Sequence, residues 1–410
     1  MKFVNIEDAM SFISRCEDDV SYLYDQIDDT VLFNQIKVLQ AFKKARVALT
    51  DFAGSTGYGY DDRGKNKLGE IVAEVFEAES AFVSPNFTCG THALSCTLFG
   101  ILRPGDLMLS ISGEPYDTLK EVISGKDIGS LNEIGIKYAQ VDLKNGEFDI
   151  DAIRECVKKL NPRLVFIQRS RGYQDRDAFS IEKIAKVIAE IRKIDKICAI
   201  MVDNCYGEFV EKHEPTAVGA DIAVGSFIKN IGGGIAPTGG YVVGKKELVD
   251  KVARHLTAPT LGNEVGSYKN GYTEFFEGLF IAPHVVGGVL KGVLMMSKTL
   301  SQLDYKTNPN PNSVPKDIIC TIELGDEDKL ISFCKTIQEN SPVDSFLSPE
   351  PWDMPGYTSK VIMAAGTFIQ GASIELSCDG PVKPPYRLYL QGGLTYEHVK
   401  IALANALLKL

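Results

Sequence analysis

Short apolar runs alternate with amphipathic segments through the middle of the chain. The segment 180–195 has four isoleucines at helical spacing between Ile181 and Ile191, and it begins at Ser180, a residue type that favours helix N-caps. The segment 149–160 has a similar pattern. The apolar runs are rich in Val, Ile and Leu and are bounded by turn residues, which is typical of buried strands. We expect strands at 106–111, 137–143, 163–170, 197–204 and 220–227.

Strands that alternate with helices form βαβ units, so the pattern predicts an α/β fold with a mostly parallel sheet. The run 239–244 is also strand-like, but too little chain separates it from 220–227 for a parallel crossover, which needs about a dozen residues. We therefore expect this strand to run antiparallel within the sheet.

The last hundred residues have a different organisation. A break rich in Pro and Asn, 306–315, precedes a mixture of strand and helix patterns that predicts a smaller α+β unit. A long helix over 283–303 is expected to join the two parts. The strands expected after the break are 316–324, 360–376 and 385–393, and the helices are 326–339 and 395–410.

Composition narrows the function classes. The net charge of -10 argues against a nucleic-acid partner, because phosphate contacts need clustered Lys and Arg. We find no run of about 20 apolar residues of the kind that spans a membrane. Nine cysteines without a CxxC pair and an N-terminus unlike a signal peptide predict reduced thiols and a cytoplasmic location. Five separated histidines predict no metal site.

Two chemically useful side chains stand at the ends of neighbouring predicted strands. Asp203 ends the run 197–204, and Lys229 follows the run 220–227. Ligands bind at the carboxyl ends of strands in parallel sheets, and an aspartate with a lysine there meets the needs of pyridoxal phosphate. The lysine would form a Schiff base, with its pKa lowered by burial beside the cofactor, and the carboxylate would pair with the ring nitrogen. Alone, Asp203 also fits a turn residue, and Lys229 an exposed strand-end lysine.

A phosphate site is predicted nearby. Cys89, Gly90 and Thr91 come directly before a helical pattern, where backbone N–H groups bind anions, although a plain helix N-cap is the alternative. Ser226 could add a hydroxyl to the same phosphate. Tyr116 follows another strand and could stack on a cofactor ring.

Two glycine-rich stretches resemble nucleotide motifs without meeting their requirements. Gly59 to Lys65 fits GxxxxGK, but Asn66 replaces the Ser or Thr that follows, and no strand leads into the loop. The glycines of 232–240 lack the strand–GxGxxG–helix order. The hypothesis that the chain is a nucleotide-dependent enzyme therefore rests on little more than the glycine content of these two stretches.

Several stretches together carry a family resemblance over nearly the whole chain. The chain resembles fold-type I pyridoxal-phosphate enzymes, within the methionine gamma-lyase-like group that includes aluminium-resistance and cystathionine-lyase-like proteins. The motifs are STGYGYDDRG, CGTHAL, GEPYDTL, QRSRGY, VDNCYGEF, GSFIKNIGGGIAPTGGYVVG and QGGLTYEHVK.

This resemblance implies a domain plan. A mostly parallel seven-stranded sheet would form the large domain, with a smaller α+β C-terminal domain. The expected divisions are an N-terminal helical arm that contributes to the dimer site (1–65), the cofactor-binding domain (66–282), the linking helix (283–305) and the small domain (306–410).

The resemblance also implies site residues. Similar enzymes are dimers or tetramers that complete each site with a tyrosine and an arginine from the neighbouring subunit. Tyr58, Tyr60 and Arg63 are the candidates for that role. Arg387 is the candidate for holding the substrate carboxylate, although Lys383 stands nearby where an arginine might be expected.

Other candidates come from the segment 168–179. Arg169, Arg171 and Tyr173 would border the pocket, although an exposed charged loop explains them nearly as well. Cys89 departs from the serine usual at its position in this group, and a thiol is a poorer hydrogen-bond partner.

The reaction implied by the resemblance is carbon–sulfur lyase chemistry on cystathionine, methionine or cysteine. The residues leave β- and γ-elimination open, together with transamination, racemisation and aldol cleavage. A pyridoxal-phosphate-binding protein with a regulatory or stress role and little turnover is the alternative from another class.

Overall fold

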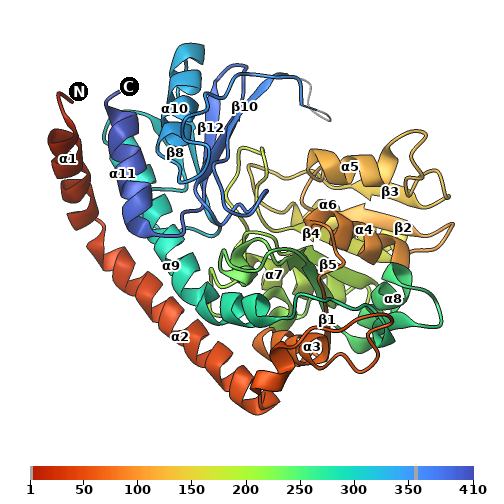
Figure 1. Ribbon diagram of the computed structural model, residues 1–410. Helices are drawn as coiled ribbons and strands as arrows, with labels where there is room; N and C mark the ends of the chain where they lie inside the picture. Colours follow the sequence, from red (N-terminus) through yellow and green to blue (C-terminus); the bar gives the residue numbers. More distant parts are fainter. Residues whose placement is uncertain (1–2, 355–358) are drawn as a thin grey trace.

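The large sheet is built from buried strands separated by helices. The computed structural model describes residues 3–354 and 359–410. Seven strands form a sheet in the order β1-β7-β6-β5-β4-β2-β3, and β7 is the strand that runs against its neighbours, as expected for 239–244 (Figure 1). The strands are β1 (Ser80–Ser84), β2 (Leu107–Ser110), β3 (Lys137–Gln140), β4 (Leu164–Gln168), β5 (Ala199–Asp203), β6 (Ile222–Ser226) and β7 (Gly240–Gly244).

Helices cover both faces of this sheet. One face carries α4 (Gly90–Ile101), α5 (Asp117–Ser124) and α8 (Lys246–Leu256), and the other carries α6 (Ile150–Leu160) and α7 (Ile181–Arg192). Successive residues of a strand point to opposite faces. In β4, Leu164 and Phe166 therefore pack with the first group, whereas Val165 and Ile167 pack with the second. Such two-sided burial is typical of parallel sheets.

The long helix α9 (Thr273–Ser301) begins well before the expected start at 283. Because proline favours the first turn of a helix, Pro283 suggested a helix start. Pro283 instead lies inside α9 and leaves one backbone hydrogen bond of the helix unmade. Burial of Phe275, Phe276 and Leu279 in the preceding turns outweighs that loss. The expectation of no apolar run of membrane length is also wrong. By length and composition α9 could cross a membrane, but 72% of its most apolar window is buried, as in a core helix.

The N-terminal segment is helical and packs on the rest of the chain. In Figure 1, α1 (Ile6–Asp18) lies beside α11 (Tyr396–Leu407), and α2 (Ser21–Ala45) runs along α9. A polar stretch then leads to α3 (Arg63–Val75), which packs against β1. The short 3-10 helices are η1 (Leu49–Phe52), η2 (Pro215–Val218), η3 (Asn230–Gly232) and η4 (Gly262–Glu264).

The C-terminal unit is an antiparallel sheet in the order β10-β11-β12-β9-β8. The strand expected over 360–376 is confirmed only at its start, and the next strand begins at Ser377, in a stretch whose Asp, Gly and Pro disfavour strands. Pairing on both edges outweighs that preference. The elements are β8 (Lys306–Asn308), β9 (Ile319–Glu323), α10 (Glu327–Glu339), β10 (Val361–Ala364), β11 (Ser377–Pro381), β12 (Arg387–Gln391) and α11.

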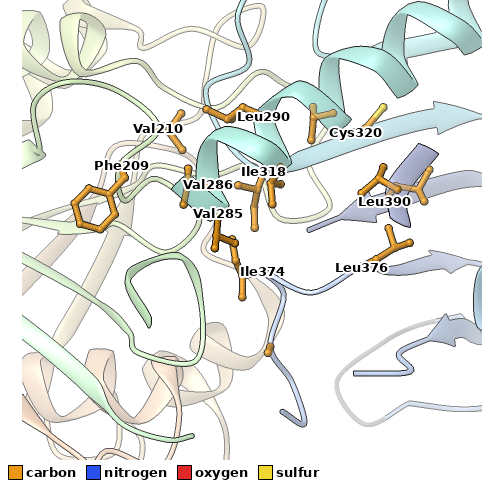
Figure 2. Close-up of a cluster of buried hydrophobic side chains, with 14 of the residues drawn as sticks. Phe209, Val210, Val285, Val286, Leu290, Ile318, Cys320, Ile374, Leu376 and Leu390 are labelled. Atoms are coloured by element: carbon orange, nitrogen blue, oxygen red, sulfur yellow. The ribbon is translucent and has the colours of Figure 1, made fainter. Parts of the chain in front are cut away.

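One hydrophobic core joins the two sheets. Figure 2 shows side chains of α9 lying between the segment that follows β5 and the strands of the C-terminal sheet. Because α9 is buried on several sides, it fixes the C-terminal sheet relative to the large sheet. The labelled members are Phe209, Val210, Val285, Val286, Leu290, Ile318, Cys320, Ile374, Leu376 and Leu390.

Candidate active site

A cavity of about 600 Å³ lies at the carboxyl ends of β4, β5 and β6. The C-terminal sheet closes another side of it through residues of β11 and β12. This end of a parallel sheet is the usual ligand-binding end, and the volume suits a cofactor with a small substrate.

Lys229 and Asp203 both line this cavity, as their positions after β6 and β5 predicted. Asp203 is buried, and its Oδ1 accepts a hydrogen bond from the Cys205 N–H at 3.1 Å. Burial raises the pKa of the Asp203 carboxyl, although the Lys229 ammonium opposes this. The side chain of Asp203 is therefore held in place before any ligand arrives.

The environment of Lys229 stabilises its ammonium form. Its Nζ lies 4.3 Å from the centroid of the Tyr206 ring. Burial opposes the charge, but Cys205, Tyr206 and Asp203 outweigh it and raise the pKa of Lys229 well above its usual value. The lowered pKa expected for Lys229 beside a bound cofactor stays a prediction, because this raised pKa is that of the free amine among these neighbours.

The predicted phosphate loop meets Lys229 at the start of α4. A Cβ built on Gly90 would lie 3.4 Å from Cys205 Sγ, 3.5 Å from Ser226 Cβ and 3.9 Å from Lys229 Nζ. The glycine thus leaves open a space that these three residues surround. Cys89 caps α4, its Sγ accepting from the His92 N–H at 3.4 Å.

Tyr116 is anchored at both its backbone and its hydroxyl. Its N–H donates to Gln168 Oε1 at 2.9 Å, and its hydroxyl lies 2.9 Å from Thr91 Oγ1. Burial, with Asp203 nearby, raises the pKa of the Tyr116 phenol, so the side chain remains neutral. Gln168, Cys205 and Tyr206 are cavity residues that sequence analysis missed, although all three lie in motifs that carried the family resemblance.

The glycines after Lys229 serve chain packing. Gly233 has φ 57° in a left-handed turn. A Cβ on Gly278 of α9 would lie 2.2 Å from the Gly232 carbonyl oxygen, so the turn and the helix touch backbone to backbone. Gly59 to Lys65 is likewise structural, since Lys65 Nζ donates to the Asn263 and Val265 carbonyls at 2.7 and 2.9 Å.

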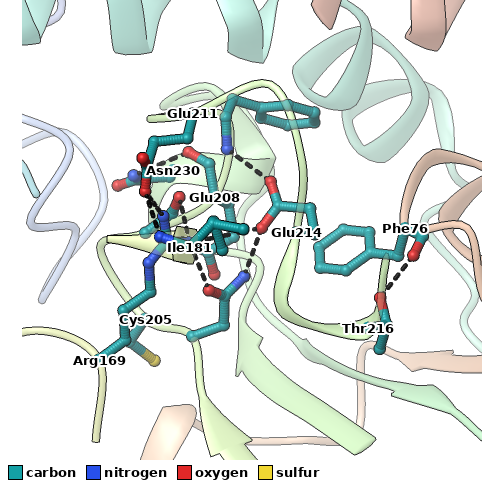
Figure 3. A network of polar contacts seen from close by, with 12 residues as sticks. Phe76, Arg169, Ile181, Cys205, Glu208, Glu211, Glu214, Thr216 and Asn230 are labelled. Atoms are coloured by element: carbon teal, nitrogen blue, oxygen red, sulfur yellow. Dashed lines mark hydrogen bonds and ion pairs between the residues drawn. The ribbon is translucent and has the colours of Figure 1, made fainter. Parts of the chain in front are cut away.

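The segment 168–179 is not an exposed charged loop. Arg169 does not line the cavity, but is buried behind it, where it binds Asn204, Glu211 and Glu214 (Figure 3). Arg171 lines the cavity, and its guanidinium is already held by both oxygens of the buried Asp317. The Arg169 contacts hold the segments after β4 and β5 together, and the Arg171–Asp317 pair joins the segment after β4 to the one before β9.

The remaining candidates lie in different places. Tyr173 lines the cavity. Arg387 is absent from its lining, and the guanidinium instead pairs with Glu323 and Asp175. Arg387 is the first residue of β12, and Tyr389, two residues further along the same strand, lines the cavity. The structure thus does not bring Arg387 to the position expected of a carboxylate-binding residue.

The N-terminal candidates lie outside their own chain's cavity. The rings of Tyr58 and Tyr60 stack on each other with centroids 5.3 Å apart, and both are exposed. Arg63 is also exposed and pairs with Asp51 at 3.0 Å.

Comparison with known proteins agrees with the expected family. Residues 9–410 match the family model for methionine gamma-lyase. The chain is 46% identical to the uncharacterized protein YnbB of Bacillus subtilis, over 95% of this chain and 93% of that protein. A solved carbon-sulfur lyase involved in aluminum resistance, from Clostridium novyi, is 46% identical with a TM-score of 0.94, covering 98% of this chain and 96% of the other.

A more distant structure shares the fold alone. The pyridoxal-5'-phosphate-dependent protein YhfS of Escherichia coli has a TM-score of 0.64 at 17% identity, over 94% of this chain and 97% of the other. The family match covers nearly the whole chain, and the two close relatives are similar to it over nearly their whole length. The chain therefore belongs to the methionine gamma-lyase family.

Proposed function

We propose that this protein is a pyridoxal-phosphate enzyme that cleaves a carbon–sulfur bond of a sulfur amino acid by β- or γ-elimination. The observation that carries the proposal is that Lys229, Asp203 and the open space at Gly90 meet in one cavity. Membership of the methionine gamma-lyase family supports the same reaction class.

The residues present fit this cofactor. Lys229 would hold it covalently through Nζ, the Asp203 carboxyl would face the ring nitrogen, and Tyr116 would cover one face of the ring. Backbone N–H groups at the start of α4, with the hydroxyls of Thr91 and Ser226, would bind the phosphate. When bound, pyridoxal phosphate supplies an electron sink for the negative charge that develops at the substrate Cα.

Proton transfer falls to Lys229. With the substrate amine bound in its place, the Lys229 Nζ would be the base that removes the Cα proton. The Tyr206 ring would then stabilise the resulting ammonium. The same amine would return the proton in a later step.

Cofactor binding and turnover test this proposal separately. The purified protein with pyridoxal phosphate should be yellow, and borohydride reduction should leave a pyridoxyl mass on the peptide that contains Lys229. A colourless protein, or a mass on another lysine, would overturn the site. Cystathionine, methionine and cysteine are then tested one by one for thiol and keto acid.

The rival reactions differ in their products. Amino-group transfer without thiol release would identify a transaminase. A yellow protein that turns over none of the three amino acids would favour a binding or regulatory role. Lys229→Ala should abolish both the fixed cofactor and any thiol release.

We also infer that two copies of the chain share each active site, with Tyr58, Tyr60 and Arg63 reaching the partner's cavity. Their exposure and their absence from the lining of their own chain's cavity support this arrangement. Mixing Lys229→Ala with Arg63→Ala chains tests it, because a mixed dimer would retain one intact site of two. Activity should recover to roughly a quarter of the native value after subunit exchange. No recovery would place Arg63 in the site of its own chain.

A further inference from the structure

The outer side of α2 has an unusual order of charged and apolar residues. Residues three and four positions apart lie on one side of a helix. In α2 and its C-cap, one such series consists entirely of exposed side chains, and Figure 1 shows the helix along the outer edge of the molecule. We call this series the α2 stripe: Tyr22, Asp25, Asp29, Leu32, Ile36, Leu39, Lys43 and Arg46.

The α2 stripe lies opposite the side of the helix that packs into the core. Most buried residues of α2 come two positions after a stripe residue: Ile27, Asn34, Val38, Ala41 and Ala45. With 3.6 residues per turn, two positions correspond to about 200° around the helix axis. The stripe is therefore a separate surface and not the rim of the contact between α2 and α9.

The middle of the α2 stripe is hydrophobic. Leu32, Ile36 and Leu39 are 61, 48 and 41% exposed, and Phe33 beside them is 38% exposed. The outward side of a surface helix is ordinarily polar. Single apolar side chains are common on a protein surface, but a contiguous row of them is typical of a protein–protein contact.

The two ends of the α2 stripe carry opposite charges. Asp25 and Asp29 form its acidic end, and Lys43 and Arg46 form its basic end. The dipole of α2 does not account for the acidic end, because dipole effects are confined to the first turn and the first turn of α2 contains no acidic residue.

These charges have no partner within their own chain. In residues 3–354 and 359–410, no ion pair involves either end of the stripe. The adjacent residues Asp28 and Lys44, which lie off the stripe, instead pair with Lys291 and Glu74. The stripe is thus a surface with an unpaired acidic end, an uncovered apolar middle and an unpaired basic end.

We propose that the α2 stripe binds the same stripe of a second copy of this chain, with the two helices antiparallel across a two-fold axis near Ile36. The acidic end of each copy then meets the basic end of the other, and the two apolar middles cover each other. A parallel alignment would bring like charges together at both ends. The stripe is therefore complementary to itself in one orientation.

This contact differs from the one inferred for the shared active site. Tyr58, Tyr60 and Arg63 lie outside the α2 stripe. The pairing also involves neither the cofactor nor the reaction, so it stands or falls independently of the proposed function. Loss of the pairing should halve the mass of the native assembly, whether or not the copies also associate through the shared site.

Charge reversal at each end of the stripe tests the pairing in the full-length protein. Asp25→Lys with Asp29→Lys makes both ends basic, and Lys43→Glu with Arg46→Glu makes both ends acidic. Each double variant alone brings like charges together, so its association through the stripe should weaken about 100-fold or more. Sedimentation analysis should then show half the native mass for each.

A mixture of the two double variants should recover the native mass, because every end then meets its opposite charge. Native mass in either variant alone, a mixture that stays at half mass, or a native protein that sediments as a monomer would overturn the proposal. Asp328→Lys with Glu339→Lys, two exposed acids of α10, makes the same change in net charge and should keep the native mass.

Ile36→Glu tests the apolar middle without the charged ends. Ile36 is about half exposed and faces away from the core, so the circular dichroism and the urea midpoint of the variant should stay close to native. Its mass should nevertheless be halved, because two glutamates would meet near the two-fold axis. A variant that folds normally and keeps the native mass would overturn the proposal.

Discussion

Replacing Glu208 with Gln should change how the stability of the protein depends on pH. Glu208 is fully buried behind the cavity, where its Oε1 accepts a hydrogen bond from the Tyr241 hydroxyl at 2.8 Å. Its Oε2 has no hydrogen-bond partner in the structure. Burial raises the pKa of this carboxyl to about 8, from an ordinary value of 4.5. Glu208 is therefore neutral at pH 7 in the folded protein and ionised in the unfolded chain.

The sign and size of this pH effect on the free energy of unfolding follow from proton linkage. Between pH 4.5 and about 8 the folded state binds the proton that the unfolded state has lost, so stability falls as pH rises through this window. The slope from this group is about 1.4 kcal/mol per pH unit, and the full effect is about 5 kcal/mol above pH 8. Below pH 4.5 both states hold the proton, and the contribution of Glu208 no longer changes.

Urea unfolding of the native protein and of Glu208→Gln at several pH values measures this effect. The fluorescence of Trp352, the single tryptophan, reports the transition. Other acids titrate equally in both proteins, so their contributions cancel in the difference. The free energy of unfolding of the variant should gain about 4 kcal/mol relative to that of the native protein between pH 5 and pH 9. A difference in the free energy of unfolding that stays constant with pH would refute the conclusion that Glu208 is a buried neutral acid.

Three further substitutions test other parts of the structure. Asp317→Asn leaves the positive charge of the buried Arg171 without its carboxylate partner, so the free energy of unfolding, measured by urea titration, should fall by about 3–5 kcal/mol. Gly90→Ala adds a methyl group at ordinary contact distances, so the fold should persist while affinity for pyridoxal phosphate, followed by absorbance titration, falls about tenfold or more. Gly278→Ala places a Cβ 2.2 Å from the Gly232 carbonyl oxygen and should cost about 1–3 kcal/mol of stability. An unchanged urea midpoint in the first and third variants, or unchanged cofactor affinity in the second, would contradict these assignments.

Local pattern predicted six of the seven strands of the large sheet, because each of the six carries its own signal, but it missed the edge strand β1 (Ser80–Ser84). The run 163–170 is apolar on both faces, and β4 is covered by helices on both sides. β11 carries no such signal, since Ser377–Pro381 contains Asp, Gly and Pro. That strand exists because β10 and β12 both pair with it, and such long-range pairing is invisible to a window of neighbouring residues.

The same distinction separates the predicted site residues from the missed ones. Lys229 and Asp203 were found because each follows a recognisable strand of a parallel sheet, which fixes where its side chain points. Asp379, a cavity residue of β11, was missed because its strand was missed, and because its place in the cavity depends on how the C-terminal sheet docks through α9. Arg387 was misplaced for another reason: its strand was predicted, but the pairs that Arg387 forms with Glu323 and Asp175 outside the cavity depend on tertiary packing and were not.

The charges of the cavity bear on how the site is completed. The cofactor phosphate brings close to two negative charges and the substrate carboxylate one more, yet the basic residues that line the cavity are already engaged by Asp203 and Asp317. The start of α4 offsets only about half a charge. A single chain therefore offers these anions little positive charge at the end of the cavity near Lys229. Arg63 of a second copy would supply the missing charge, because its side chain is 65% exposed, but it would have to leave its pair with the fully buried Asp51. A partner chain's arginine would thus meet the need for positive charge near Lys229.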